Sequence, residues 1–518
     1  MIKIHQIKVP VDKALSIDII ARKLHCLPKE ISSFAIDRQS LDARGPHLHY
    51  SYTVYAQVRN EEKYLRNKDV TAEEKEMYVL PSPQPKQTDQ PIIVGFGPAG
   101  MFSALILAEC GLRPIIIERG RPVEERTKDI DAFFQKGELD EESNVQFGEG
   151  GAGTFSDGKL TTRMKNVRIG KVFDEFIGAG ADPAISYQHR PHLGTDALRI
   201  IVKNIRQKII SLGGEIHFNT RMEDLITADH KLTGLHTTAG DFMSSHIILC
   251  GGHSASDTYQ NLYRQGVAIE QKDFAAGVRV EHLQSMIDQC TYGNFAGDPH
   301  LEPASYQLTA KTKFNRGVYS FCMCPGGIVI PSSAKKNALA VNGMSYSQRN
   351  GANANSAILV QIPRKDFDHG DPLDGFRFQQ ELEKHAYRNG YEAPCQNIHD
   401  YLAHTVSKTP IIPTSFPRGI VMEDMHALFS EEVSGALEEG LRTFGHRIKG
   451  FDDQGIMVGM ESRSSSPIRL LRTEDGCSVS CQGLYPAGEG AGYAGGIVSS
   501  AVDGIKQAEN LIMDLNRD

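Results

Sequence analysis

Polar and apolar residues alternate in the first part of the chain, from Met1 to Val9. This alternation indicates a β-strand, because successive side chains of a strand point to opposite faces. Apolar residues at helical spacing predict a helix over Ala14–Leu24, and β-branched and aromatic residues predict strands over Ser32–Asp37 and His47–Val58. We therefore expect a small α/β domain, followed by a polar and Pro-rich linker, together spanning residues 1–85.

A different pattern begins at Ile92–Val94, a short apolar run typical of a buried strand. Helical and strand-like segments follow as far as about Gly252, and short strand-like runs then predict a mostly antiparallel sheet. These runs are Ala276–Val280, Ser305–Thr309, Val318–Cys322, Ile328–Ile330, Ala338–Val341 and Ala357–Ile362. Helices are predicted over Phe376–Arg388 and Phe429–Ile448.

Length and charge narrow the functional classes. A chain of 518 residues is too long for one hydrophobic core, so we expect several domains. The net charge of −8 argues against a general surface for nucleic acids or anionic membranes. No apolar run is long enough to span a bilayer, and the nine cysteines are scattered rather than framed like a secreted disulfide scaffold. The cytoplasm is the expected compartment.

A phosphate-binding motif follows the strand Ile92–Val94. In Gly95–Gly100, the first glycine permits a tight turn, Gly97 lets the backbone approach a pyrophosphate, and Gly100 lets the next helix pack closely on the strand. That helix is predicted over Met101–Cys110 and would offer free amides to the phosphates. A second strand over Pro114–Ile117 ends at Glu118, which can accept hydrogen bonds from the adenosine ribose. The pattern predicts a dinucleotide site and disfavours NADP there.

A glycine-rich segment near the C-terminus distinguishes FAD from NAD. Gly483–Glu489 is typical of a short strand that runs into a glycine, and Gly490–Gly496 leads to a predicted helix over Ile497–Ile512. Two-domain flavoproteins use such a segment to hold the ribitol chain and one edge of the flavin, whereas NAD dehydrogenases have no need of it. We expect Glu489 to bind a ribitol hydroxyl and the last helix to point its N-terminus at the flavin. FAD is the predicted cofactor.

Two further glycine-rich segments fit this site. Asn144–Lys159 carries glycines and small hydroxyl side chains that would lie against the cofactor, and Ser245–Gly252 is a strand that enters a glycine pair. The predicted FAD-binding residues are Gly95, Gly97, Pro98, Ala99, Gly100, Glu118, Arg119, Gly150, Gly151, Gly153, Thr154, Ser156, Asp157, Gly158, Gly251, Gly252, Gly488, Glu489, Gly495, Gly496 and Ile497.

Several motifs together resemble those of the uncharacterised bacterial FAD-dependent dehydrogenases. They are Gly148–Leu160, Gly252–Thr258, Phe321–Gly327, Glu461–Pro467 and Gly483–Gly496. More distantly, the chain is similar to the glutathione-reductase-type flavoproteins, which include the fumarate reductase flavoprotein subunit and the geranylgeranyl reductases. The resemblance implies FAD and a two-dinucleotide-binding fold, but no substrate. Many relatives carry Asp where this chain has Glu489, although the fumarate-reductase-like branch also uses Glu.

The resulting fold prediction is α/β, with a Rossmann-like FAD-binding domain, an inserted mostly antiparallel domain and the small N-terminal domain. The FAD-binding domain would comprise residues 86–275 and 455–518, and the inserted substrate domain residues 276–454. A substrate would then meet the flavin beneath the inserted sheet.

Four residues are candidates for chemistry. Cys322 and Cys324 could form a redox pair, or they could be packing residues on one face of a strand. Arg463 could bind an anionic substrate or the flavin edge, or it could form a surface salt bridge. His253 could act in acid–base chemistry, or it could only make hydrogen bonds in a turn.

We therefore expect an FAD-dependent oxidoreductase that passes hydride or electron pairs between a small organic molecule and flavin N5. The chain has no second complete nucleotide-binding motif, so NADH or NADPH could bind only transiently. No group of His and Cys has the spacing of a zinc or iron–sulfur site, so no metal is predicted. Two alternatives are an RNA-modifying FAD protein and a non-enzymatic binding protein with the same fold.

Overall fold

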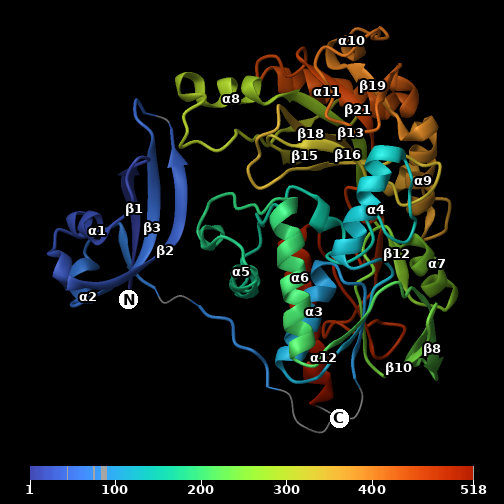
Figure 1. The fold of residues 1–518 in the computed structure, drawn as a ribbon, viewed down its shortest axis with the longest axis horizontal. Coiled ribbons are helices and arrows are strands. Elements are labelled where there is room, and N and C mark those ends of the chain that lie inside the picture. The colour runs from blue at the N-terminus through green and yellow to red at the C-terminus, as the bar shows by residue number, and fades with distance from the viewer. Residues whose placement is uncertain (44, 74–75, 83–89, 517–518) are drawn as a thin grey trace.

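The computed structural model describes residues 1–43, 45–73, 76–82 and 90–516. The N-terminal part forms a four-stranded antiparallel sheet in the order β2-β3-β1-β4 (Figure 1). It contacts the rest of the chain through β2, where the Gln39 amide donates to the Tyr187 carbonyl at 2.7 Å. Its elements are β1 (Ile2–Pro10), α1 (Ile17–Leu24), β2 (Ile31–Asp42), β3 (His49–Val58), α2 (Glu61–Tyr64) and β4 (Val70–Ala72). Most of the predicted linker is described, but residues 83–89 lie outside the described residues.

A five-stranded parallel sheet in the order β23-β11-β5-β6-β7 forms the centre of the second part. Its strands are β5 (Ile92–Val94), β6 (Ile115–Ile117), β7 (Glu215–His217), β11 (Ile247–Leu249) and β23 (Leu484–Pro486). The C-terminal strand β23 thus completes a sheet that begins almost 400 positions earlier, at Ile92. The apolar runs of these strands are buried on both faces, as expected of a parallel sheet.

Helices cover this sheet, and the first and last of them pack directly against each other. The helices of this part are α3 (Pro98–Glu109), α4 (Val123–Lys136), α5 (Arg168–Gly178), α6 (Thr195–Ser211), α7 (Ser256–Arg264) and α12 (Ile497–Leu515). Ser103 of α3 donates a hydrogen bond to the carbonyl of Gly504 in α12, at 2.9 Å. A Cβ at Gly504 would lie 2.1 Å from the Ala99 carbonyl, so the close contact of the two helices requires glycine there.

Two smaller sheets flank the parallel sheet. The first contains β8 (Met222–Ala228), β9 (Lys231–Thr237) and β10 (Gly240–Met243). The second pairs β12 (Ile269–Gln271) with β22 (Ile468–Leu470), where the chain leaves the central unit and where it returns.

The third part is built on a seven-stranded sheet in the order β14-β15-β18-β13-β21-β19-β20. Its strands are β13 (Phe274–Leu283), β14 (Thr309–Lys311), β15 (Gly317–Cys324), β18 (Asn353–Ile362), β19 (Ala393–Asn397), β20 (Ile420–Met422) and β21 (Gly455–Glu461). All neighbours are antiparallel except β19 and β20. A hairpin of β16 (Ile328–Pro331) and β17 (Val341–Met344) packs on it, together with α8 (Gln284–Tyr292), α9 (Asp374–Ala386), α10 (Ile398–Leu402) and α11 (Glu431–Gly445).

Two of the predicted strands in this part are misplaced. Residues 305–308 are not a strand. The amide of Leu308 donates to the side-chain hydroxyl of Ser320, whose own amide donates to the Leu308 carbonyl, and regular strand pairing begins only at Thr309. The strand predicted over Ala338–Val341 begins only at Val341, since Leu339 donates to the Glu383 carbonyl instead. Because β21 belongs to the seven-stranded sheet, we place the end of the inserted domain after Glu461 rather than at residue 454.

The predicted fold class, a Rossmann-like α/β unit with an inserted antiparallel sheet and a small N-terminal α/β unit, is confirmed. Within the described part of the chain, each helix is too short or too polar to cross a membrane.

Candidate FAD-binding site

The carboxyl ends of four of the five parallel strands bring three glycine-rich segments and one glutamate to one edge of the sheet. β5 leads into Gly95, β11 into Gly251 and β23 into Gly488, while β6 ends at Glu118. Since parallel strands end on the same side, segments from opposite ends of the sequence meet there. This edge is where open α/β sheets bind their ligands.

The Gly95–Gly100 turn has the geometry that the motif predicts. Gly95 has φ +94°, and a Cβ there would lie 2.4 Å from the Cys250 carbonyl. A Cβ at Gly100 would lie 1.9 Å from the Gly95 carbonyl, so α3 packs too closely on the turn for any larger residue. Pro98 and Ala99 form the start of α3, whose first-turn amides have no carbonyl partners within the helix. These amides are available to an anionic ligand.

Glu118 is buried and holds three loops together. Its carboxylate accepts hydrogen bonds from the backbone amides of Phe96 at 2.7 Å, Gly120 at 2.9 Å and Gly148 at 3.0 Å. A carboxylate has about four acceptor positions, so one remains for a ribose hydroxyl. Glu118 therefore both shapes the loops and keeps capacity for a nucleotide.

Arg119, the next residue, is held in a fixed position. Its guanidinium pairs with Asp257 at 3.0 Å and with Glu142 at 2.8 Å, and it stacks on the Phe147 ring at 4.0 Å. The pKa of Arg119 is raised, because its two carboxylate partners outweigh the effect of burial. Its charge is therefore already paired, and it would meet a nucleotide through its flat face rather than as a free cation.

The predicted loop over Asn144–Lys159 lies against the phosphate-binding turn. A Cβ at Gly151 would lie 3.0 Å from Gly97 Cα, and a Cβ at Gly153 would lie 3.0 Å from the Ile497 side chain. This loop thus packs against the N-termini of both α3 and α12. Gly150, Thr154, Ser156 and Gly158 lie in the same loop, where Thr154 and Ser156 bond to its own backbone.

Asp157, at the end of this loop, forms a buried clamp to the inserted domain. Its carboxylate pairs with Arg349 at 2.5 Å and Lys159 at 2.8 Å, and it accepts a hydrogen bond from Ser345 at 2.6 Å. Burial would raise the pKa of Asp157, but the two cations outweigh this effect and lower it below its ordinary value. Because these partners use its oxygens, we expect Asp157 to fix the loop rather than contact the cofactor.

The C-terminal segment presents Glu489 at the same edge. The Gly488 amide donates to Asp503 at 2.8 Å, and Asp503 is paired with Arg472 at 2.7 Å, which fixes the turn after β23. The Glu489 carboxylate stays partly exposed, and its Oε1 lies 3.8 Å from Nδ1 of His253.

His253 is buried and has one nitrogen without a partner. Its Nε2 lies 3.0 Å from Oε1 of Gln379, whose amide group in turn donates to the Ser462 carbonyl. Nε2 therefore carries a proton, and Nδ1 is an acceptor when the ring holds only that one. Nδ1 is buried without a hydrogen bond and faces the Glu489 carboxylate. The buried Nδ1 therefore calls for a donor, such as a ligand hydroxyl.

These features fit FAD. Backbone Cα atoms of Gly252 and Gly495 face open space, since a Cβ at either would meet nothing within 4 Å. The edge also offers helix amides for phosphates, acceptors for sugar hydroxyls, and the N-terminus of α12 for the flavin ring. These hydrogen-bond donors and acceptors match a dinucleotide that carries two sugar portions.

Comparisons with known proteins identify the relatives of the chain. An uncharacterized protein of Clostridium beijerinckii is 42% identical over 525 residues, which cover 99% of this chain and 98% of that protein. The chain belongs to the family of this protein. Residues 273–464 match the family described as FAD-dependent protein, C-terminal domain-like, and residues 1–57 match a domain of unknown function, DUF8436. The cofactor of this FAD-dependent family is FAD, which confirms the sequence prediction.

Solved structures that match are more distant. Glycine oxidase from Bacillus cereus is 12% identical, covers 82% of this chain and 95% of its own, and has a TM-score of 0.32. A geranylgeranyl bacteriochlorophyll reductase-like protein from Thermoplasma acidophilum is 12% identical, covers 83% and 79%, and has a TM-score of 0.39. Likenesses this weak carry no argument about substrate.

The prediction that Cys322 and Cys324 share one face of a strand is wrong. Cys322 and Cys324 were expected to share one face of a strand, but the ladder has a β-bulge between Phe321 and Cys324, and Cys322 has φ +42°. As a result Cys322 is exposed and Cys324 is buried, with its thiol 3.2 Å from the Cys322 carbonyl. Surrounding protein desolvates both thiols, which raises the pKa of Cys322 to about 12 and also raises that of Cys324. Neither is a ready thiolate.

Arg463 forms a buried ion pair. Its guanidinium makes two bonds of 2.7 Å to Glu383, which is 1% exposed, and a 2.8 Å bond to Ser254. Ser462 also donates to Glu383, at 2.6 Å. The geometry favours the salt-bridge interpretation over direct substrate binding, although the pair is buried rather than on the surface as that interpretation assumed.

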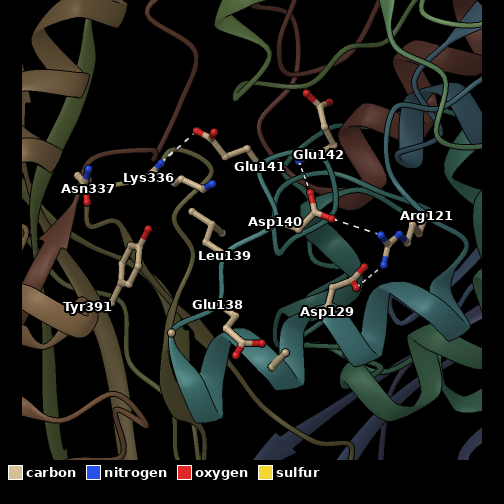
Figure 2. Close-up of a pocket in the computed structure, with 12 residues that line it drawn as sticks. Arg121, Asp129, Glu138, Leu139, Asp140, Glu141, Glu142, Lys336, Asn337 and Tyr391 are labelled. Carbon is tan, nitrogen blue, oxygen red and sulfur yellow. Dashed lines mark hydrogen bonds and ion pairs between the residues drawn. The ribbon is translucent and has the colours of Figure 1, made fainter.

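A surface hollow of about 860 Å³ lies beside the site but shares none of the predicted FAD-binding residues. It is lined by acidic residues after α4 together with Lys336, Asn337 and Tyr391. Figure 2 shows its Arg121 turned toward Asp129 and Asp140, which lie 2.6 and 3.5 Å away. With its arginine already paired, the hollow does not suit an anionic nucleotide.

Proposed function

We propose that this protein is an FAD-dependent oxidoreductase of the glutathione-reductase-type two-dinucleotide-binding superfamily, acting on a small organic substrate. The observation that carries the proposal is the meeting of four segments at one sheet edge: Gly95–Gly100, Glu118, the Gly148–Gly158 loop and Gly488–Ile497. A non-enzymatic protein would have no need to keep both the phosphate end and the flavin end of such a site.

Each segment would hold one portion of the cofactor. The first-turn amides of α3 would bind the pyrophosphate, and Glu118 would accept a hydrogen bond from the adenosine ribose. Nδ1 of His253, which is buried without a partner, would accept a hydrogen bond from one ribitol hydroxyl, and the Glu489 carboxylate would accept one from another. The N-terminus of α12 would place its partial positive charge beside the flavin pyrimidine ring.

Bound FAD supplies a centre that accepts or donates two electrons at flavin N5. The chain itself contributes the position and surroundings of that centre. The inserted sheet, whose loop carries Arg349, is clamped to the FAD-binding unit through Asp157. Such a clamp would hold the sheet over the flavin and exclude water from it.

The substrate would enter where this clamp meets the seven-stranded sheet. Cys322 is exposed there, and the cation of Lys159 acts on its thiol. Lys159 is paired with Asp157 but keeps about a third of its side chain exposed, whereas Arg463 and Asp157 are paired and buried more deeply. We therefore propose Cys322 and Lys159 as the first side chains to test for substrate contact.

The proposal also includes what the protein would not need. We propose that NADH or NADPH binds only transiently if at all, that nucleic acid is no partner, and that the protein works in the cytoplasm. The acidic net charge of −8 supports the second point.

Anaerobic reduction of the bound flavin tests the proposal. The purified protein would be mixed with NADH, NADPH and a panel of small organic donors, and loss of the oxidised flavin absorbance would be followed. We expect an organic donor to bleach the flavin and both nicotinamides to do so slowly. A Lys159→Met variant should lose the reaction with that donor while it keeps FAD, and Lys313→Met, which alters an exposed lysine paired with Glu439, would serve as a lysine control. A protein that holds FAD but transfers no electrons to or from any donor or acceptor would contradict the proposal.

A further inference from the structure

A cluster of two histidines and a glutamate lies on the surface of the inserted domain. His404 follows α10, His426 lies in a short 3-10 helix over Met425–Leu428, and Glu438 lies on α11. Their ligand atoms all lie within 4.8 Å of one another. Figure 1 places α10 and α11 at the end of the molecule away from α3 and α12, so this cluster is separate from the FAD site.

The distances within the cluster match the edges of a metal coordination shell. Nε2 of His426 lies 3.1 Å from Oε1 of Glu438, and Nε2 of His404 lies 3.4 Å from the same oxygen. Two ligands bound to Zn²⁺ at about 2.0–2.1 Å in tetrahedral geometry lie about 3.3–3.4 Å apart. An ion could therefore take the place of the protons between these atoms with small side-chain shifts.

The second nitrogen of His426 is held as in a metal site. Its Nδ1 lies 2.8 Å from Oδ1 of Asp424, which can only accept, so Nδ1 carries a proton and Nε2 is the nitrogen free to ligate. A carboxylate behind a histidine in this way fixes the ring and makes it a better ligand. The ring is also stacked on Tyr401, at 3.9 Å between centroids. His426 is thus oriented before any ion arrives.

His404 supplies the adjustable ligand. Its side chain is 65% exposed and stacks loosely on His426, with ring centroids 4.6 Å apart. Because the side chain is mostly exposed, the ring can rotate until its Nε2 and Nε2 of His426 both point at the same ion position.

We propose that His404, His426 and Glu438 bind a divalent transition-metal ion of the Zn²⁺ type, with water in the fourth position. Two imidazoles and one carboxylate suit Zn²⁺ far better than Mg²⁺ or Ca²⁺, which prefer oxygen ligands. The ion would tie the segment after α10 to α11 and so stabilise this end of the inserted domain. The sequence showed no such site, because the ligands are 22 and 12 positions apart and only the fold brings them together.

Zinc binding to the full-length, FAD-loaded protein tests this inference. After removal of metals with a chelator, Zn²⁺ would be titrated in competition with a chromophoric chelator that absorbs apart from the flavin. We expect one Zn²⁺ per chain and a zinc-dependent rise in the midpoint of thermal unfolding. His404→Ala and Glu438→Gln should abolish both effects, and Asp424→Asn should weaken binding by about 10–100-fold.

The chain offers a matched control. His399 on α10 is also 65% exposed and lies beside Asp400, at 3.5 Å, but outside the cluster. His399→Ala should bind Zn²⁺ as the unaltered protein does. The inference is overturned if no Zn²⁺ binds, or if His404→Ala and Glu438→Gln leave binding unchanged. Since His404 is exposed, its replacement should leave folding intact even if His426→Ala does not.

Discussion

Nδ1 of His253 and Oε1 of Glu489 face each other at 3.8 Å with no hydrogen-bond donor between them. His253 is 8% exposed, so the unpaired nitrogen carries a cost unless a ligand satisfies it. This pair is the most specific sign of a sugar hydroxyl in the proposed FAD site.

Replacement of His253 by Leu should weaken FAD binding. Loss of one hydrogen bond of about 1 kcal/mol corresponds to roughly a fivefold rise in Kd. Titration of flavin-free protein with FAD, followed by flavin fluorescence, would measure the Kd of each variant. His236→Ala, which alters an exposed histidine paired with Asp241, should have no effect. Equal affinities in His253→Leu and the unaltered protein would mean that Nδ1 is not a cofactor ligand.

Cys322 should react slowly with alkylating agents. Its pKa of about 12 leaves little thiolate at pH 8, and only the thiolate is nucleophilic. We expect iodoacetamide to modify Cys322 at least about a hundredfold more slowly than an ordinary exposed thiol. Peptide mass spectrometry would follow both Cys322 and the exposed Cys290 in one sample. Rapid labelling of Cys322 would revive the redox interpretation.

Arg463→Ala should destabilise the protein strongly. It would leave the Glu383 carboxylate buried without its partner, which typically costs about 3–5 kcal/mol. Urea unfolding would measure the free energy of unfolding, and Arg364→Ala, which removes an exposed arginine paired with Asp273, is the control. If Arg463→Ala kept its stability but lost flavin reduction, Arg463 would instead be a substrate or flavin ligand.

Glu149 should make stability depend on pH. Burial raises the pKa of its carboxyl from 4.5 to about 7, so the folded chain holds this proton more tightly than the unfolded chain. The stability that the protonated acid contributes is present at low pH and falls as pH rises from about 4.5 through 7. Glu149→Gln should therefore gain about 1–3 kcal/mol relative to the unaltered protein between pH 5 and pH 8. Parallel unfolding curves at the two pH values would contradict the assignment.

The sequence predicted the parts of the site that depend on local backbone geometry. Gly95 and Gly100 could be assigned because a turn between strand and helix has few solutions, and the fold class followed from the order of elements. Contacts between distant segments could not be predicted. The Asp157–Arg349 clamp and the Arg463–Glu383 pair join positions 192 and 80 residues apart, and no periodicity signals them. The bulge at Cys322 was missed because alternation along a strand assumes an unbroken ladder.

The most direct test of the account is the flavin content of the purified protein and of two variants, one from each end of the site. Flavin released by denaturation should be FAD rather than FMN, at one molecule per chain. Glu118→Gln and Glu489→Gln should each retain less FAD, because their carboxylates would hold different sugars of the same molecule. Glu474→Gln, an exposed C-terminal control, should retain it fully. A colourless protein that takes up no FAD, or equal FAD retention in all three variants, would contradict a site built from both ends of the chain.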